Sequence, residues 1–334
     1  MSLGLQSLSA SPFLGNLGAG ERSLWRFLLA LFGGALVFIV VAILAFLLSL
    51  LFMVLACGWP APTSTEGLQA FARRLSDLSN SDGHSFADAS QIMALALPGN
   101  ILPMFSFIAI AALVHRRRIK DFVTSWPRFR WRLMLTGFVL STIVIGPFLA
   151  VGQMLDPKAG LPPVLLVSPD IVLRVVYALL CVIAFTPAAM GEEILFRGWL
   201  LRQTAVLVRQ PLVLMAVNGV LFSAAHLDFA PDAFLERALM GAGFTYMTLR
   251  LGGVEMSCGV HAANNLMIVL FLQPLTLKLS PNTPLDAGTA VSYVGLFVAY
   301  IGMAELIARW TPLRRWTQGE PPPPSASAEA EHFS

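Results

Sequence analysis

Charge is scarce in this chain of 334 residues. Asp, Glu, Lys and Arg make up 12% of it, whereas a soluble domain has about a quarter. Hydrophobic residues account for 56% of the chain, and the mean hydropathy is +0.73. So few charges cannot solvate the whole surface of a protein of this size. The composition therefore excludes an ordinary soluble protein and predicts a polytopic integral membrane protein.

The sequence also lacks the short alternating apolar and polar segments that a membrane β-barrel requires. Instead it has long runs without charge, several of which reach the roughly 20 residues that cross a hydrocarbon core as a helix. The shortest run spans if Arg237 and Arg250 extend to the interfaces. We expect an all-α membrane protein with about eight transmembrane helices, over the runs 27–63, 91–114, 133–155, 175–191, 210–225, 238–249, 256–277 and 287–304.

Cysteine is rare as well. The three cysteines, Cys57, Cys181 and Cys258, are scattered and form no CxxC motif, which argues against a disulfide framework and a thiolate zinc site. The first apolar run is too long for the core of a signal peptide, and no small-residue cleavage site follows a short one. We interpret it as a retained transmembrane helix.

Positive charge is concentrated between the second and third runs, where "HRRRIKDFVTSWPRFRWR" (115–132) carries seven Lys or Arg residues. The positive-inside rule makes this loop cytoplasmic. Counting spans then places both termini in the cytoplasm and the 57–90 and 273–288 loops outside, with the helical segment "LQAFARRLSDL" at the outer membrane surface. We expect the basic loop to contact membrane lipids rather than nucleic acid, in the plasma (inner) membrane if the host is bacterial.

The chain divides into one membrane domain and two polar ends. Residues 1–22 are predicted to be a flexible cytoplasmic N-terminus, and residues 313–334 a disordered cytoplasmic tail rich in Pro, Ala, Ser and Glu. The membrane domain covers residues 23–312, and its polar motifs lie in a core of about residues 171–310.

Few ionisable groups lie within the apolar runs, and a charge at membrane depth is costly enough to need a partner or a function. In "MGEEILFRGWLL" (190–201), Glu193 and Arg197 are four residues apart, so a helix brings them together as an ion pair. Glu192 is rotated about 100° away on the same helix. It is left free to face another helix, where a buried carboxylate suits general-base chemistry.

Three further polar residues are expected near Glu192 within the membrane. If the hairpin turn after the fourth run is centred near residue 209, Glu192 and His226 lie level in the membrane. His261 follows the "LGG" turn (251–253) by about two helical turns, and Asn265 lies one turn deeper on the same face. The sequence predicts that the four side chains converge in a cavity open toward the cytoplasm.

"EEILFR", "FSAAH" and "HAANN", in this order and spacing, resemble the motifs of the CPBP family, the CAAX proteases and bacteriocin-processing (Abi) proteins. The resemblance covers roughly residues 185–270. It implies a CAAX-protease-like helical bundle and an intramembrane endopeptidase that cleaves peptide or lipoprotein substrates. The resemblance implies that Glu192 activates water and that His226 assists it. His261 and Asn265 would stabilise the oxyanion, and Glu193 and Arg197 would support these four residues.

The resemblance leaves the cofactor open. The family is commonly described as metalloproteases, and Zn²⁺ could be held by Glu192, His226 and His261. The chain has no H-E-x-x-H motif, however, and asparagine is a poor zinc ligand. A metal-free mechanism based on glutamate fits the same residues.

Two other functions remain open on the sequence. A catalytically silent membrane scaffold or bacteriocin immunity factor would keep the same fold without cleaving. A transporter would also place polar groups in the membrane, although no internal repeat is visible. A single membrane histidine is often only a hydrogen-bonding link between helices. Asp228 and Asp232 are expected in a solvated loop, and Asn218 and Asn264 in packing roles.

Overall fold

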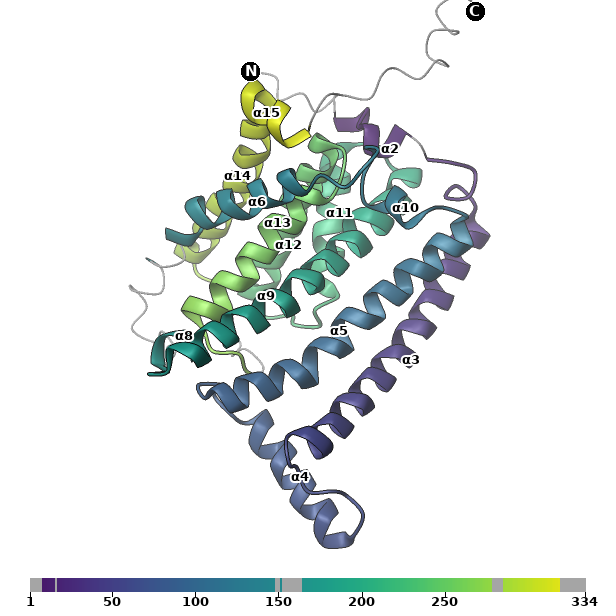
Figure 1. Ribbon diagram of the computed structural model, residues 1–334. Coiled ribbons are helices and arrows are strands. Elements are labelled where there is room, and N and C mark those ends of the chain that lie inside the picture. Colours follow the sequence, from purple (N-terminus) through teal and green to yellow (C-terminus); the bar gives the residue numbers. More distant parts are fainter. Residues whose placement is uncertain (1–7, 16, 148–150, 152–163, 278–284, 319–334) are drawn as a thin grey trace, which may run out of the picture.

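The computed structural model describes residues 8–15, 17–147, 151, 164–277 and 285–318 (Figure 1). The described residues form helices joined by turns and no strand, apart from one isolated bridge between Thr124 and Gly253. The protein is an all-α polytopic membrane protein, as its composition predicted.

Among the residues that the structure describes, five helices are long and apolar enough to cross a membrane. They are α3 (Leu24–Ala56), α5 (Phe86–His115), the continuous segment Ile171–Leu207, the segment Glu255–Leu272, and α14 (Ala287–Arg309). The first of the two segments joins α9 (Ile171–Glu193), η2 (Ile194–Leu200) and α10 (Leu201–Leu207); the second joins α13 (Glu255–Met267) and η3 (Ile268–Leu272).

The other three predicted runs also contain helices, but with different lengths from those expected. Helices α6 (Trp131–Val144) and α11 (Pro211–Ala224) have only 14 residues each, about 21 Å at 1.5 Å per residue. Helix α12 (Pro231–Leu251) is longer than its apolar run, because Asp232, Glu236 and Arg237 lie inside it. The number of actual membrane crossings, predicted as about eight, stays a prediction.

Polar residues just before the helices explain where many of them begin. Ser64 and Ser85 each accept a hydrogen bond from the amide three residues later, at 3.0 Å, and Asp286 does the same at 2.9 Å. Asp170 accepts from Val172 N at 2.8 Å. These side chains satisfy amides that have no partner within their helix. Helix α11 begins at Pro211, whose missing N–H costs nothing at a first helical position.

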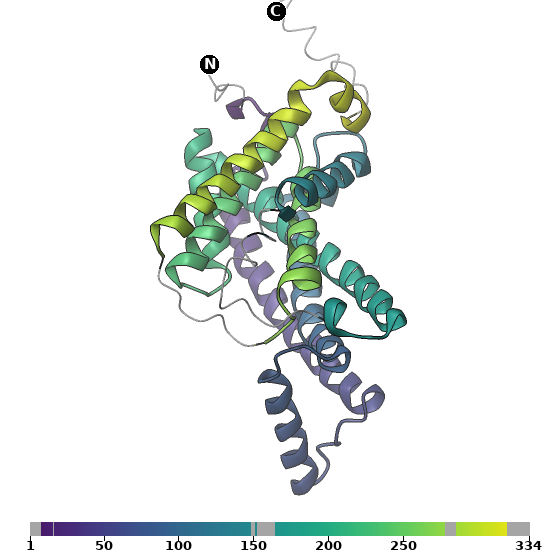
Figure 2. The same ribbon diagram turned by 90° about the vertical axis from the view of Figure 1, so that its left-hand side faces the viewer.

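Helix α13 lies at the centre of the bundle. In its most apolar 18-residue window, 72% of residues are buried, against 17% in α3 and in the Ile171–Leu207 segment. It packs against α6 and α9, whereas α3 pairs with α5, and α12 packs between α11 and α14 (Figures 1 and 2). Polar side chains on α13 are therefore held in the protein interior rather than against lipid.

Small residues let the central helices approach closely. A Cβ atom on Gly259 of α13 would overlap the carbonyl oxygen of Met134 in α6, and one on Gly137 of α6 would lie 2.6 Å from Met256 O of α13. Such small residues at helix crossings are typical of membrane bundles, where close backbone packing holds helices together.

Replacing Gly259 with alanine should destabilise the fold, because the new methyl group meets a backbone atom that cannot move aside. Overpacking of this kind costs about 1–3 kcal/mol. The matched control is Gly295→Ala on α14, where nothing lies within 4 Å of the added atom. Thermal unfolding in detergent should show a lower Tm for Gly259→Ala and an unchanged or higher Tm for Gly295→Ala. Equal Tm values would contradict the close approach.

The described N-terminal residues are packed against the helix ends, which differs from the flexible tail expected over residues 1–22. Leu8, Phe13 and Leu14 are almost completely buried, and Ser11 Oγ donates to the carbonyl of Leu249 at 2.6 Å. This segment has few apolar side chains, but they pack against the ends of the helices. We call residues 8–15 and 17–22 the N-terminal strap; it includes α2 (Pro12–Gly15).

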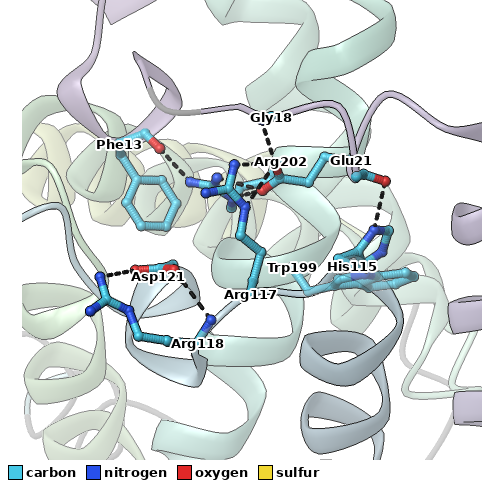
Figure 3. A network of polar contacts seen from close by, with 10 residues as sticks. Phe13, Gly18, Glu21, His115, Arg117, Arg118, Asp121, Trp199 and Arg202 are labelled. Carbon is cyan, nitrogen blue, oxygen red and sulfur yellow. Dashed lines mark hydrogen bonds and ion pairs between the residues drawn. The ribbon is translucent and has the colours of Figure 1, made fainter.

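Glu21 fastens the strap to helix α10 and to the turn that follows α5 (Figure 3). Its carboxylate accepts hydrogen bonds from the amide of Gly18 at 2.7 Å, from Arg117 NH2 at 2.7 Å and from Arg202 Nε at 2.8 Å. Arg202 NH1 also donates to Phe13 O at 2.7 Å. Burial raises the pKa of Glu21, but the charge of Arg202 and these hydrogen bonds outweigh it, so the pKa is held below its usual value.

Acid should therefore loosen the strap. Because the pKa of Glu21 is lower in the folded protein than in the unfolded chain, the stabilisation is complete above about pH 4.3 and is lost as the pH falls further through the folded value. Glu21→Gln should unfold at a lower temperature than wild type at neutral pH, and the gap should narrow in acid. A constant gap across the titration would contradict this assignment.

Different segments of the chain lie at the two ends of the molecule. The N-terminal strap, the start of the basic loop at His115 and the helix α15 (Thr311–Gln318) lie at one end, and α4 (Thr65–Ser79) lies at the other (Figure 1). The placement of the termini relative to the membrane, predicted as cytoplasmic for both, stays a prediction. The predicted tail is helical in α15 as far as residue 318, and its residues 319–334 lie outside the described residues.

Candidate functional site

Glu192 and Glu193 are the last two residues of α9, where the helix changes its winding. The next seven residues, Ile194–Leu200, form the π-helical segment η2 before α-helical hydrogen bonding resumes in α10. Short π-helical segments are rare and occur frequently at functional sites. The two carboxylates are thus placed at an irregular point in a helix that is otherwise continuous for 37 residues.

Glu193 is completely buried and has two partners. Its Oε1 accepts from Arg197 NH1 at 3.0 Å, so the predicted ion pair is present. The same oxygen lies 2.9 Å from Nδ1 of His261 on α13. A carboxylate oxygen can only accept, so Nδ1 carries the proton, and Nε2 points to the other side of the ring. Glu193 therefore also orients His261.

Arg197 is enclosed by aromatic rings. Its guanidinium carbon lies 4.2 Å from the ring centre of Phe222, 5.3 Å from that of Phe244 and 6.0 Å from that of Phe196. Cation–π contacts and the Glu193 ion pair compensate the cost of burying this charge. Its Nε and NH2 groups have no hydrogen-bond partner among the described residues.

Glu192 is 9% exposed and has no arginine as an ion-pair partner among the described residues. Its Oε2 lies 3.7 Å from Nε2 of His261, beyond direct hydrogen-bond distance, and it has no hydrogen-bond partner there. Among the described residues, Oε2 of each carboxylate lacks a hydrogen-bond partner. The two carboxylates differ in their other contacts: Glu193 Oε1 binds both Arg197 and His261, whereas Glu192 has no arginine partner there and lies beside the imidazole of His261.

His226 lies just beyond the end of α11, and its side chain is exposed. Its Nδ1 is 2.8 Å from the carbonyl oxygen of Phe222, which can only accept, so Nδ1 is the donor and the neutral ring keeps a lone pair on Nε2. His226 is close enough to Glu192 and His261 to interact with both electrostatically. The next residue, Leu227, has φ +55°, a left-handed conformation unusual for a non-glycine residue.

Asn265 follows His261 by one turn of α13, so both lie on the same helix face. Its side chain is half-buried, and it makes no hydrogen bond to another described residue. The neighbouring Asn264 is buried and directs Nδ2 to within 4.0 Å of Met240 Sδ on α12, a packing contact as expected. The structure thus gathers Glu192, His226 and His261, and it places Asn265 on the same face as His261.

The arrangement does not match a preformed metal site. Among the residues that the structure describes, no three His, Cys, Asp or Glu side chains converge closely enough to hold a metal ion. Nδ1 of His261 donates to Glu193 Oε1 and Nδ1 of His226 donates to a carbonyl, which leaves Nε2 of each neutral ring available, as is common for histidines that bind a metal. Zinc held by Glu192, His226 and His261 stays a prediction, and the mechanism proposed below uses side chains alone.

Two features of the site go beyond the predictions. The contact between Glu193 and His261 joins residues 68 positions apart, and nothing in the local sequence signals it. The spacing of "FSAAH" indicates that Phe222 lies one helical turn before His226. It does not indicate that the ring of Phe222 lies over the guanidinium of Arg197. Asp228 is not simply solvated: it pairs with Arg237 at 3.0 Å, and Asp232 lies in the first turn of α12.

Comparison with known proteins finds a match over the part of the chain that contains the candidate site. Residues 174–267 match the model of a family described as type II CAAX prenyl endopeptidase Rce1-like. The uncharacterized protein YyaK of Bacillus subtilis (strain 168) is 26% identical over 164 residues, which are 47% of this chain and 53% of YyaK. The chain thus spans about half the length of the curated relative that it matches. No solved structure matches it. The matched region, residues 174–267, holds all of the predicted site residues, and the family that it resembles is the one that the motifs indicated.

Proposed function

We propose that this protein is an intramembrane endopeptidase that hydrolyses peptide bonds of membrane-associated or lipid-modified substrates near the cytoplasmic face. One observation carries the proposal: Glu192 has a free carboxylate oxygen beside the imidazole of His261, which the buried Glu193 holds in place. The family match over residues 174–267 gives the reaction class its support.

In the proposed mechanism, Glu192 is the general base. A water molecule beside Glu192 gives its proton to the carboxylate, and the resulting hydroxide attacks the carbonyl carbon of the scissile bond. His226 assists by accepting a hydrogen bond from this water at Nε2, since its Nδ1–H is donated to Phe222 O. The protonated Glu192 then delivers the proton to the leaving amine, which balances the reaction.

His261 and Asn265 are proposed to stabilise the oxyanion that forms in the tetrahedral intermediate. In the charged form of His261, Nδ1 donates to Glu193 and Nε2 donates into the space beside Glu192. The amide of Asn265 supplies a second donor from the next turn of α13. Donors that are already oriented before the reaction typically contribute a few kcal/mol to such a step.

The proposal is tested with a mixed library of membrane-anchored peptides, with and without a lipid modification, reconstituted in proteoliposomes with the purified protein. Peptide products identified by mass spectrometry are the expected result. A parallel reaction with a chelator tests whether cleavage requires a metal ion. The proposed mechanism uses none, so the cleavage rate should be unchanged. Loss of cleavage that Zn²⁺ restores would overturn the metal-free mechanism while leaving a protease. A library left uncut in every arm would favour a silent scaffold.

A further inference from the structure

A cavity lies at the end of the bundle that carries the N-terminal strap, apart from the cluster around Glu192. Its volume is about 320 Å³, within the range of small-molecule sites. It lies between the first residues of α3 and the helices α10 and α11, and most of its lining is aliphatic or aromatic. None of the predicted site residues lines it.

The cavity opens toward the apolar perimeter of the bundle. Three of its lining residues are also exposed leucines: Leu24 is 70% exposed, Leu207 84% and Leu221 41%. In a protein that spans a membrane, exposed leucines face hydrocarbon rather than water. A hydrocarbon chain can therefore enter the cavity sideways from the bilayer.

The lining of the cavity also offers a donor and positive charge. Gln203, which lines it, is 5% exposed, and its buried Nε2 has no hydrogen-bond partner among the described residues. Buried donors in native structures are normally satisfied, so an unpaired amide on a cavity wall indicates an acceptor on the ligand that fills it. The exposed Arg22 lines the cavity as well.

The start of α3 adds to this positive potential. Its first turn contains no acidic residue but carries Arg26, where the helix dipole disfavours a cation. An anion bound here would relieve that repulsion and would meet free amides at the helix N-terminus. The carboxylate of Glu21, which also lines the cavity, is already neutralised by Arg117 and Arg202, so it does not repel an anion.

We propose that this cavity binds an anionic phospholipid, with an acyl chain among the leucines and valines and the phosphate group at Arg22, Gln203 Nε2 and the N-terminus of α3. The lining of the cavity matches this one molecule: exposed leucines suit an acyl chain, and an arginine with a buried amide donor suits a phosphate group. Gln203 belongs to the same continuous helix as Glu192 and Glu193, so the bound lipid rests on the element that carries the proposed site.

The test is native mass spectrometry of the full-length protein in detergent, titrated with phosphatidylglycerol, with phosphatidylcholine and with glycerol 3-phosphate. The wild type should bind one phosphatidylglycerol about tenfold more tightly than phosphatidylcholine. Arg22→Gln and Gln203→Leu should each weaken phosphatidylglycerol binding by about fivefold or more. Val217→Phe, which fills the cavity, should weaken binding of both lipids.

Arg315→Gln on α15, an exposed arginine away from the cavity, is the matched control and should bind like wild type. Because Arg22 is also exposed, its replacement tests the proposal even if the cavity-filling variant fails to fold. Equal binding of the two lipids, or equal behaviour of Arg22→Gln and Arg315→Gln, would overturn the assignment. Binding of glycerol 3-phosphate as tight as that of the lipid would show a phosphate site instead.

Discussion

Replacing Glu192 with glutamine should abolish most peptide cleavage while leaving the fold intact. The side chain keeps its shape but can no longer accept a proton from water, and removing a general base costs about 10²–10⁴ in rate. Little stability should be lost, because Glu192 Oε2 has no hydrogen-bond partner among the described residues and the carboxylate forms no ion pair with an arginine there. The measurements are the initial cleavage rate in proteoliposomes and the Tm in detergent.

The neighbouring carboxylate provides the matched comparison for this prediction. Glu193→Gln removes the negative charge that Arg197 and His261 share, so it should lower the Tm as well as the rate. Glu66→Gln, an exposed carboxylate in α4, should change neither. If Glu192→Gln lowered the Tm as much as Glu193→Gln and kept the wild-type rate, the two roles would have to be exchanged.

Replacing Arg197 with methionine should cause the largest loss of stability. Both Arg197 and Glu193 are completely buried, so the substitution leaves a carboxylate in the interior without its guanidinium partner. Breaking a buried ion pair from one side costs about 3–5 kcal/mol. The expected result is a much lower Tm, together with loss of cleavage, because His261 loses a firmly held acceptor.

A double substitution separates loss of the pair from loss of packing. Glu193→Gln combined with Arg197→Met removes both charges, so its Tm should recover part of what Arg197→Met alone loses. Cleavage should not recover, because the charged acceptor of His261 is still missing. If Arg197→Met unfolded at the wild-type temperature, the buried pair would contribute nothing to the fold.

The features that depend on local sequence could be predicted. The turn between α10 and α11 falls at residues 208–210, centred on residue 209 as expected, and it brings Glu192 and His226 within electrostatic range. The ion pair of Glu193 and Arg197 follows from helical spacing alone. Predicting each of these features requires only the periodicity of one helix or the position of one turn between two antiparallel helices.

The features that depend on contacts between distant segments could not be predicted. The N-terminal strap has too few apolar residues to form a recognisable pattern, and it is ordered by Arg202 and the helix ends that it covers. Likewise, η2 and the contact of Glu193 with His261 depend on how α9 and α13 pack. Tertiary packing determines these features, and a single sequence records it only indirectly.

The most direct test of the proposed mechanism is cleavage of a membrane-anchored peptide in water enriched in ¹⁸O, by wild type and by Glu192→Gln. If Glu192 activates a water molecule, wild type incorporates one ¹⁸O into each new carboxyl terminus, and the variant yields almost no labelled product. Labelled product formed equally fast by both proteins would contradict the role of Glu192.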